Sequence, residues 1–106
     1  MPDFMGLMKQ AAEFKTKMDA LQAELERTEV DGAAGGGLVT ITVTGKGEVK
    51  SVKIDASLLK PEEKEIVEDL IVAAHGEARR KAEALLQEKM QSLTGGLPLP
   101  PGMKLF

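Results

Sequence analysis

Residues 35–55, GGGLVTITVTGKGEVKSVKID, contain the pattern from which the sheet of this protein can be predicted. Valine and isoleucine alternate with threonine over residues 38–44, which is the period-two pattern of a strand with one buried face. Gly45-Lys46-Gly47 supplies turn residues, and residues 49–54 return with Val52 and Ile54 on one face. The stretch therefore predicts an antiparallel hairpin. A short strand over residues 29–33 is expected to complete a three-stranded antiparallel sheet, so that the sheet occupies residues 29–54.

The glycines and lysines of this stretch also raise the alternative of a nucleotide-binding loop. A Walker loop needs glycine, four residues, then Gly-Lys-Ser/Thr, and it must open a helix whose backbone amides meet the phosphate. Here Gly45-Lys46 is followed by Gly47, the place of the first glycine is Thr40, and the segment opens a strand. The sequence does not match the dinucleotide-binding motif G-x-G-x-x-G either. Gly35 and Gly37 match its first two glycines, but Thr40 occupies the position of the third. We interpret Gly35–Gly37 as a tight turn before the strand, because glycine can adopt backbone angles that other residues rarely adopt.

Residues 4–28, before the sheet, carry the strongest periodic pattern in the chain. Apolar residues recur at steps of three and four over about three heptads, which predicts a long helix with one apolar stripe. Such a helix is ~38 Å long at its usual rise, whereas a compact domain of this size has a radius of gyration of only ~13 Å. The helix should therefore project beyond its domain, and a second chain is expected to cover the stripe. The homodimer interface predicted in this way consists of Phe4, Leu7, Ala11, Phe14, Met18, Leu21 and Leu25.

Residues 61–94 predict a second long helix. Pro61 suits the first helical position, and an acidic first turn follows it, which the helix dipole favours. Apolar residues then recur at helical spacing, and the alanines at the centre indicate a close backbone approach to another element. Gly95-Gly96 is expected to end the helix, and the proline-rich tail over residues 95–106 is expected to be extended. The whole chain, residues 1–106, is thus predicted to be one α+β domain.

Composition narrows the class of function. The chain has no cysteine, which favours a reducing compartment and excludes a thiolate metal site. Its only histidine, His75, lies in mid-helix beside Gly76 without a plausible set of metal ligands. No apolar run is long enough to cross a bilayer. We therefore expect a cytoplasmic protein with no enzymatic activity, no cofactor, no metal, no membrane contact and no small-molecule substrate.

Four segments together resemble one protein family. They are MKQA (8–11), GGGLVTITVTGKGEVKSVKIDASLL (35–59), EDLIVAAHGEA (68–78) and EKMQSLTGGLPLPPGMK (88–104), and in this order they resemble the YbaB/EbfC family of bacterial nucleoid-associated proteins. The resemblance implies a homodimer of helix–three strands–helix subunits whose long helices project like the arms of a tweezer. It also implies location in the cytoplasm and nucleoid, binding to duplex DNA, and a role in nucleoid organisation or gene regulation.

The resemblance places the DNA-binding surface on basic groups of the projecting helices. For several of these basic groups the alternative is an ion pair within the helix, because a carboxylate lies four residues away. Glu13 has this spacing from Lys9 and Lys17, Glu83 from Arg79, and Glu77 from Lys81. The hairpin lysines are further candidates, since residues 32–60 are the segment with net positive charge. The candidates are Lys9, Lys15 and Lys17 on the first helix, Arg79, Arg80 and Lys81 on the last, and Lys46, Lys50 and Lys53 in the hairpin.

The residue types also predict how DNA would be bound. The chain carries no asparagine and no grouped arginines and glutamines of the kind that read base edges, and its net charge is −3. We expect contacts to phosphates, weak sequence preference and strong salt dependence. The alternative is a coiled-coil scaffold that binds protein partners through its stripe and its proline-rich tail without binding DNA.

Overall fold

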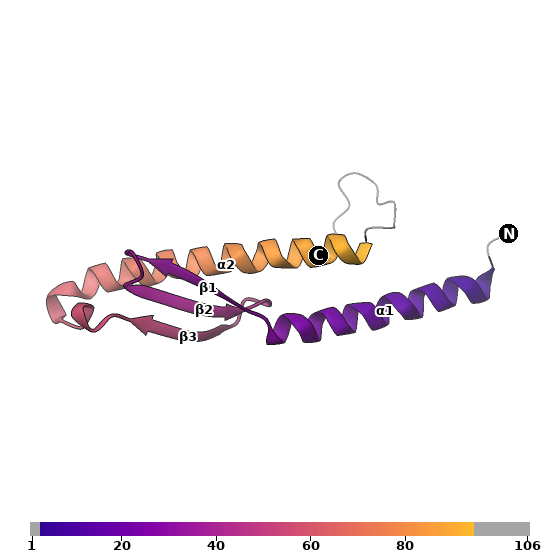
Figure 1. Cartoon of the computed structure of the whole chain (residues 1–106), viewed down its shortest axis with the longest axis horizontal. Coiled ribbons are helices and arrows are strands. Elements are labelled where there is room, and N and C mark those ends of the chain that lie inside the picture. The colour runs from indigo at the N-terminus through magenta and orange to yellow at the C-terminus, as the bar shows by residue number, and fades with distance from the viewer. Residues whose placement is uncertain (1–2, 95–106) are drawn as a thin grey trace.

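The computed structural model describes residues 3–94. The chain runs through one long helix, a sheet, two short 3-10 turns and a second long helix, which confirms the predicted α+β class and the three-stranded antiparallel sheet (Figure 1). The predicted end of the second helix at Gly95-Gly96 and the proline-rich tail lie outside the described residues. The elements are α1 (Phe4–Arg27), β1 (Glu29–Ala34), β2 (Val39–Thr44), β3 (Val49–Ile54), η1 (Ala56–Leu58), η2 (Pro61–Glu63) and α2 (Lys64–Thr94).

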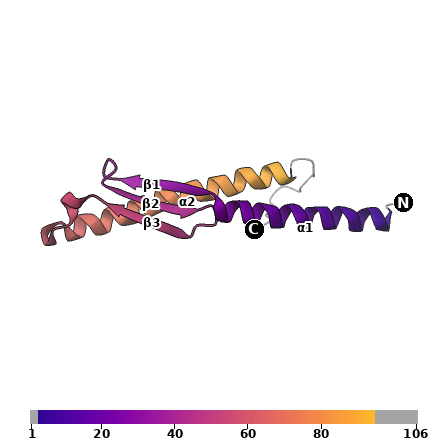
Figure 2. The same ribbon diagram turned by 60° about the horizontal axis from the view of Figure 1, so that its bottom comes forward.

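The molecule is elongated, measuring 71 × 27 × 16 Å with a radius of gyration of 19.6 Å. A compact chain of this length would have a radius of gyration of about 13 Å. The difference arises because α1 runs away from the sheet, whereas α2 first crosses the sheet and then continues beside α1 (Figures 1 and 2). Two helices therefore project from the sheet in the same direction.

The sheet has the order β1-β2-β3, and both strand pairs are antiparallel. Val39, Ile41 and Val43 of the central strand are at most 1% exposed and form the core with the alanines of α2. In the edge strand β3, in contrast, Val49 and Val52 are 50% and 46% exposed. The core is thus concentrated where α2 lies on β1 and β2. In β3, Ile54 packs against this core, whereas Val49 and Val52 stay open to solvent.

Glycine and alanine allow α2 to lie directly on β1. A Cβ atom at Gly32 would lie 2.1 Å from the carbonyl oxygen of Ala74 and 2.3 Å from the backbone nitrogen of Ala78. Ala74 and Ala78 are themselves completely buried. This confirms the close backbone approach that the alanines of the second helix predicted, and identifies β1 as the element approached.

The turns of the sheet depend on glycine, as expected. Gly35, Gly36 and Gly37 between β1 and β2 have φ angles of 66°, 69° and 97°, which side chains with a Cβ rarely adopt. The β2–β3 turn also fixes the base of α1, because the backbone N–H of Gly45 lies 2.9 Å from the carbonyl oxygens of both Leu25 and Thr28. The direction in which α1 leaves the sheet is therefore set by this turn.

The C-terminal end of the α1 stripe is covered within the chain. Leu21 and Leu25 are 7% and 3% exposed, and they form a second apolar cluster with Met90 of α2. The sequence predicts a second chain over the whole stripe, because the pattern of α1 alone does not show that α2 extends beside it. A second chain is not needed at this end of the stripe. At the other end, Phe4 and Leu7 remain 72% and 52% exposed.

Candidate nucleic-acid interface

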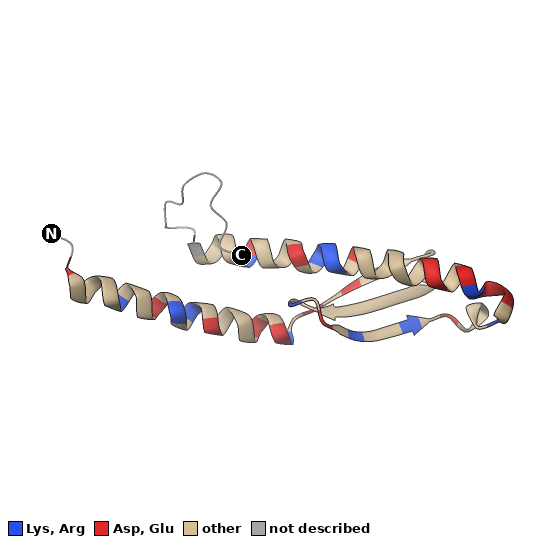
Figure 3. Cartoon of the chain, turned by 180° about the vertical axis from the view of Figure 1, so that it is seen from behind, with Lys and Arg blue, Asp and Glu red and all other residues tan. Residues whose placement is uncertain are grey.

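Basic residues are distributed along both projecting helices, and acidic residues lie between them (Figure 3). The side chains of Lys15 on α1 and Arg79 on α2 are 80% and 70% exposed. These cations are therefore in contact with solvent. The basic residues differ from one another mainly in whether a neighbouring carboxylate already binds them.

Three of the predicted helix cations form ion pairs within their own helix. Lys15 Nζ lies 3.2 Å from Asp19 Oδ2, and Arg79 Nε lies 3.1 Å from Glu83 Oε1. Lys81 is held most firmly, because its Nζ pairs with Glu77 at 3.1 Å and also donates a hydrogen bond to the carbonyl oxygen of Asp31, 2.8 Å away in β1. The hydrogen bond and charge of Lys81 lower the pKa of the Glu77 carboxyl below its usual value.

The other three helix cations form no ion pair within residues 3–94. Lys9 and Lys17 do not pair with Glu13, although the sequence spacing allowed it. Arg80 has no carboxylate within salt-bridge distance in this part of the chain, although its charge contributes to lowering the pKa of Glu77. Arg80 lies along α2 over Gly76: a Cβ at position 76 would be 3.3 Å from Arg80 Nη1. The glycine beside His75 thus leaves space for the guanidinium.

The hairpin lysines do not join the helix cations in one patch. Lys46 extends from the turn to α1, where its Nζ lies 3.0 Å from Glu26 Oε1. Lys53 stands opposite Thr40 in the β2–β3 register, and Thr40 alternates with core residues, so Lys53 lies on the sheet face away from α2. Lys50 is the extra residue at an irregularity in β3, where Val43 pairs with Val49 and Thr42 with Ser51. Lys50 and Lys53 are exposed.

One ion pair that the sequence did not indicate connects the two helices. Lys89 Nζ of α2 lies 2.8 Å from Glu24 Oε1 of α1. The hydrogen bond and charge of Glu24 raise the pKa of Lys89 above its usual value. The two residues are 65 positions apart in the chain (89 minus 24), so no local spacing could have predicted the contact.

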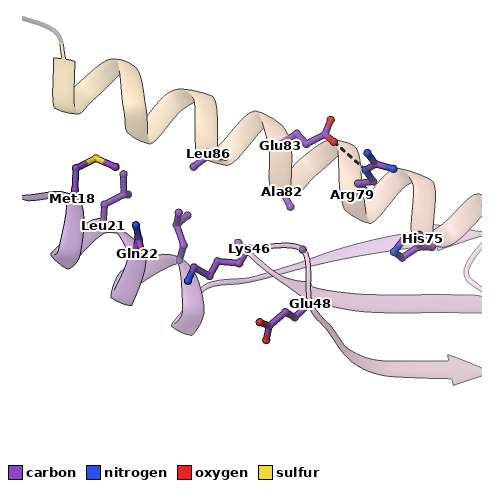
Figure 4. A pocket seen from close by; sticks show the side chains of 13 residues that line it. Met18, Leu21, Gln22, Lys46, Glu48, His75, Arg79, Ala82, Glu83 and Leu86 are labelled. Carbon is purple, nitrogen blue, oxygen red and sulfur yellow. Dashed lines mark hydrogen bonds and ion pairs between the residues drawn. The ribbon is translucent and has the colours of Figure 1, made fainter. Parts of the chain in front are cut away.

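A groove of about 760 Å³ separates α1 from the middle of α2 beside the β2–β3 turn. Figure 4 shows Met18 and Leu21 on α1 facing Ala82 and Leu86 on α2, with the Arg79–Glu83 pair at the rim. His75 also lines the groove, together with Glu48 of the turn. Within residues 3–94, no three His, Asp or Glu side chains come together in a way that could hold a metal ion. The groove is mainly an apolar surface with charged edges.

In the part of the chain from residue 3 to residue 94, neither long helix combines the length and the apolar character that crossing a bilayer requires.

The fold and this surface define a class: small α+β proteins in which two long charged helices project side by side from a three-stranded sheet. A family model described as the YbaB/EbfC DNA-binding family matches residues 1–97. The chain belongs to this family, as the sequence resemblance had indicated.

Individual relatives agree with this assignment. A nucleoid-associated protein of Nitrobacter winogradskyi is 64% identical over 103 residues, which are 97% of each chain. A nucleoid-associated protein of Bradyrhizobium sp. (strain ORS 278) is 65% identical over 102 residues, or 96% of each chain. The crystal structure of an uncharacterized protein from Helicobacter pylori superposes with a TM-score of 0.80 at 25% identity, covering 90% of this chain and all of the other.

Proposed function

We propose that this protein is a nucleoid-associated protein that binds duplex DNA as a homodimer, mainly through phosphates and with weak sequence preference. In the cytoplasm and nucleoid it would organise the chromosome or regulate genes. The observation that carries this proposal is the set of unpaired cations on the projecting helices, Lys9, Lys17 and Arg80. Family membership and the names of the relatives support the choice of DNA as the ligand.

An unpaired cation is a better phosphate ligand than a paired one. A lysine in an ion pair must first lose its carboxylate partner, and that carboxylate then lies close to the incoming phosphate. Lys15, Arg79, Lys81 and Lys46 are therefore proposed as secondary contacts. Lys50 and Lys53 are unpaired within residues 3–94 but lie on another side of the molecule, so they would meet DNA only if it bends or if a second chain changes the geometry.

The homodimer is proposed because exposed apolar side chains are concentrated at the N-terminal end of α1. Phe4, Met5, Leu7 and Met8 are 72%, 74%, 52% and 56% exposed. A second chain that packed on the exposed part of the stripe, from Phe4 to Ala11, would remove this surface from water and gain roughly 25 cal/mol for each Å² of apolar area buried. Two subunits would also present two sets of cations to one duplex, which increases avidity without further contacts.

The test is a salt titration of binding to a duplex of about 30 base pairs of arbitrary sequence, with two charge-reversal variants. The variant Lys9→Glu with Lys17→Glu should bind much more weakly than the wild type, and its plot of log affinity against log salt should be less steep by about 0.9 for each phosphate that the protein no longer neutralises. The control, Lys60→Glu with Lys64→Glu, changes the net charge equally at exposed positions at the opposite end of the molecule. Equal losses in both variants would show a general charge effect and contradict the proposed surface.

A scaffold protein that binds partner proteins through the exposed part of α1 is the second candidate function. The same exposed residues, Phe4 to Met8, favour it. It would be preferred if the wild-type protein failed to bind duplex DNA even at low salt while remaining folded.

A further inference from the structure

The two projecting helices are joined by a small contact. The buried part of this contact consists of Leu21, Leu25 and Met90, and the Glu24–Lys89 ion pair lies beside it. A cluster of three buried side chains is small compared with the core under the sheet, which has seven. The separation of the helices would therefore be more firmly set if a further element packed between them.

A second groove, of about 380 Å³, lies at this contact and is still open in the described part of the chain. Lys17, Ala20 and Leu21 line it from α1, and Ser92 and Leu93 line it from α2. Glu24 and Lys89, the residues of the ion pair, line it as well. The groove thus combines three apolar residues with charged and polar ones, and Ser92 and Leu93 of its lining belong to the last turn of α2.

The chain itself continues from that end of the groove. Twelve residues, 95–106, follow Thr94, and the first of them are Gly95-Gly96-Leu97-Pro98-Leu99-Pro100-Pro101. A glycine after a helix commonly takes a left-handed conformation, and the apolar residue that follows it then folds back on the last helical turn. With Gly96 in that position, Leu97 would contact the turn that contains Ser92 and Leu93.

The residues after Leu97 have the right pattern to continue along the groove. Leu97 and Leu99 each precede a proline, which disfavours helical backbone and favours an extended one. In an extended segment, side chains two residues apart point to the same side, so both leucines could enter the groove together. The prolines also reduce the conformational entropy that docking would cost.

We propose that residues 97–101 of the same chain dock in this groove as a strap, with Leu97 and Leu99 on Ala20, Leu21 and Leu93. The strap would fix the separation of α1 and α2, and with it the position of Lys17 at the edge of the groove. The occupant is the chain's own tail because its attachment point is at the groove, which gives it an effective concentration in the millimolar range that a free peptide rarely reaches. This inference does not depend on DNA binding.

The full-length protein can be tested directly, because it contains no cysteine and a single introduced cysteine can be labelled selectively. A nitroxide at Gly102→Cys should broaden the amide NMR signals of residues 17–24 and 91–93 and leave those of β3 unchanged. Absence of broadening on α1 would overturn the proposal. In a mixture of ¹⁵N-labelled protein without nitroxide and unlabelled protein with nitroxide, broadening should disappear. If it persisted, the occupant would be the tail of a second copy and the same-chain proposal would be wrong.

Two matched variants test the leucines. Leu97→Ser with Leu99→Ser should abolish the broadening on α1 and increase the hydrogen-exchange rates of residues 19–25 several-fold. The control, Met103→Ser with Leu105→Ser, removes a similar apolar area further along the tail and should leave both measurements unchanged. Equal effects in the two variants, or none in the first, would overturn the assignment of Leu97 and Leu99 to the groove.

Discussion

Gly32 of β1 and Ala74 of α2 lie so close that a Cβ atom at Gly32 would be 2.1 Å from the Ala74 carbonyl oxygen. A second backbone atom of α2 is almost as close, since the nitrogen of Ala78 would be 2.3 Å away. Neither group can rotate out of the way as a side chain could. The contact between α2 and the sheet therefore requires glycine at this position.

The variant Gly32→Ala should lose at least about 3 kcal/mol of unfolding free energy, at or above the upper end of what overpacked cores usually cost. The reason is that α2 must move away from β1, which separates its alanines from the central strand. Urea unfolding followed by circular dichroism measures the loss.

The control is Gly6→Ala, at a position where a Cβ would meet only Asp3 atoms at 3.7 Å or more. Because Gly6 lies in helix α1, alanine there should stabilise the helix by up to about 1 kcal/mol. A Gly32→Ala protein as stable as the wild type would show that α2 is not held against β1 at this distance.

The helices and strands were predictable from local sequence patterns, whereas the contacts between distant elements were not. The alternation of residues 38–44 and the turn at Gly45–Gly47 predicted the hairpin, and the periodic apolar residues predicted both helices. The contact of Leu21 and Leu25 with Met90 was not predictable, because each helix pattern is compatible with a partner in the same chain or in another. Long-range pairing depends on the direction in which α1 leaves the sheet, which the hydrogen bonds of the Gly45 N–H determine.

The candidate site was predictable by residue type and only partly by pairing. Helical spacing allowed Glu13 to pair with Lys9 or Lys17, Glu83 with Arg79, and Glu77 with Lys81, and the structure shows the last two pairs. Lys46 lies in the hairpin turn as predicted, and the sequence did not indicate its partner, Glu26, which is on α1. Long side chains choose among several carboxylates according to the three-dimensional arrangement, which sequence spacing does not contain.

The Glu77–Lys81 pair should contribute to the dependence of stability on pH. Because Lys81 lowers the pKa of Glu77 in the folded protein below its usual value of 4.5, the contribution is present above pH 4.5 and is lost as pH falls through the folded value. The free energy of unfolding of Glu77→Gln should therefore decrease less steeply than that of the wild type on acidification below pH 4.5. Urea titrations between pH 3 and pH 7 measure the two slopes.

Lys81→Met supplies the matched test for this pair. It removes the cation with the largest effect on the pKa of Glu77, although the charge of Arg80 also lowers that pKa. Its pH dependence should therefore approach that of Glu77→Gln, and adding Glu77→Gln to it should change little further. If the wild type and Glu77→Gln had the same slope, the ion pair would not be maintained in solution.

The exposed part of the α1 stripe should control association between subunits. Leu7→Glu places a charge in the proposed interface, and because Leu7 is 52% exposed in the single chain, the variant should remain folded. It should sediment as a monomer at concentrations at which the wild type is a dimer. Lys17→Glu, at an exposed position on the side of α1 opposite Phe4 and Met8, is the control and should remain a dimer. Dimerisation of Leu7→Glu at wild-type affinity would show that the interface lies elsewhere, and Val49 and Val52 of β3 would be the next candidates.

Arg79 and Arg80 are adjacent on α2 and differ in their partners, which gives the sharpest test of the DNA surface. Arg79 binds Glu83, whereas Arg80 forms no ion pair within residues 3–94 and extends over Gly76. Arg80→Ala should weaken binding to unrelated duplexes uniformly and decrease the salt slope by about 0.9, the value for one phosphate that is no longer neutralised.

Arg79→Ala has the same change in charge and size, but it also leaves Glu83 without its cation. If phosphate replaced Glu83 as the partner of Arg79 on binding, the two variants would lose affinity equally. If the ion pair largely persists in the complex, as we expect of a secondary contact, the salt slope of Arg79→Ala should stay closer to that of the wild type than the slope of Arg80→Ala does.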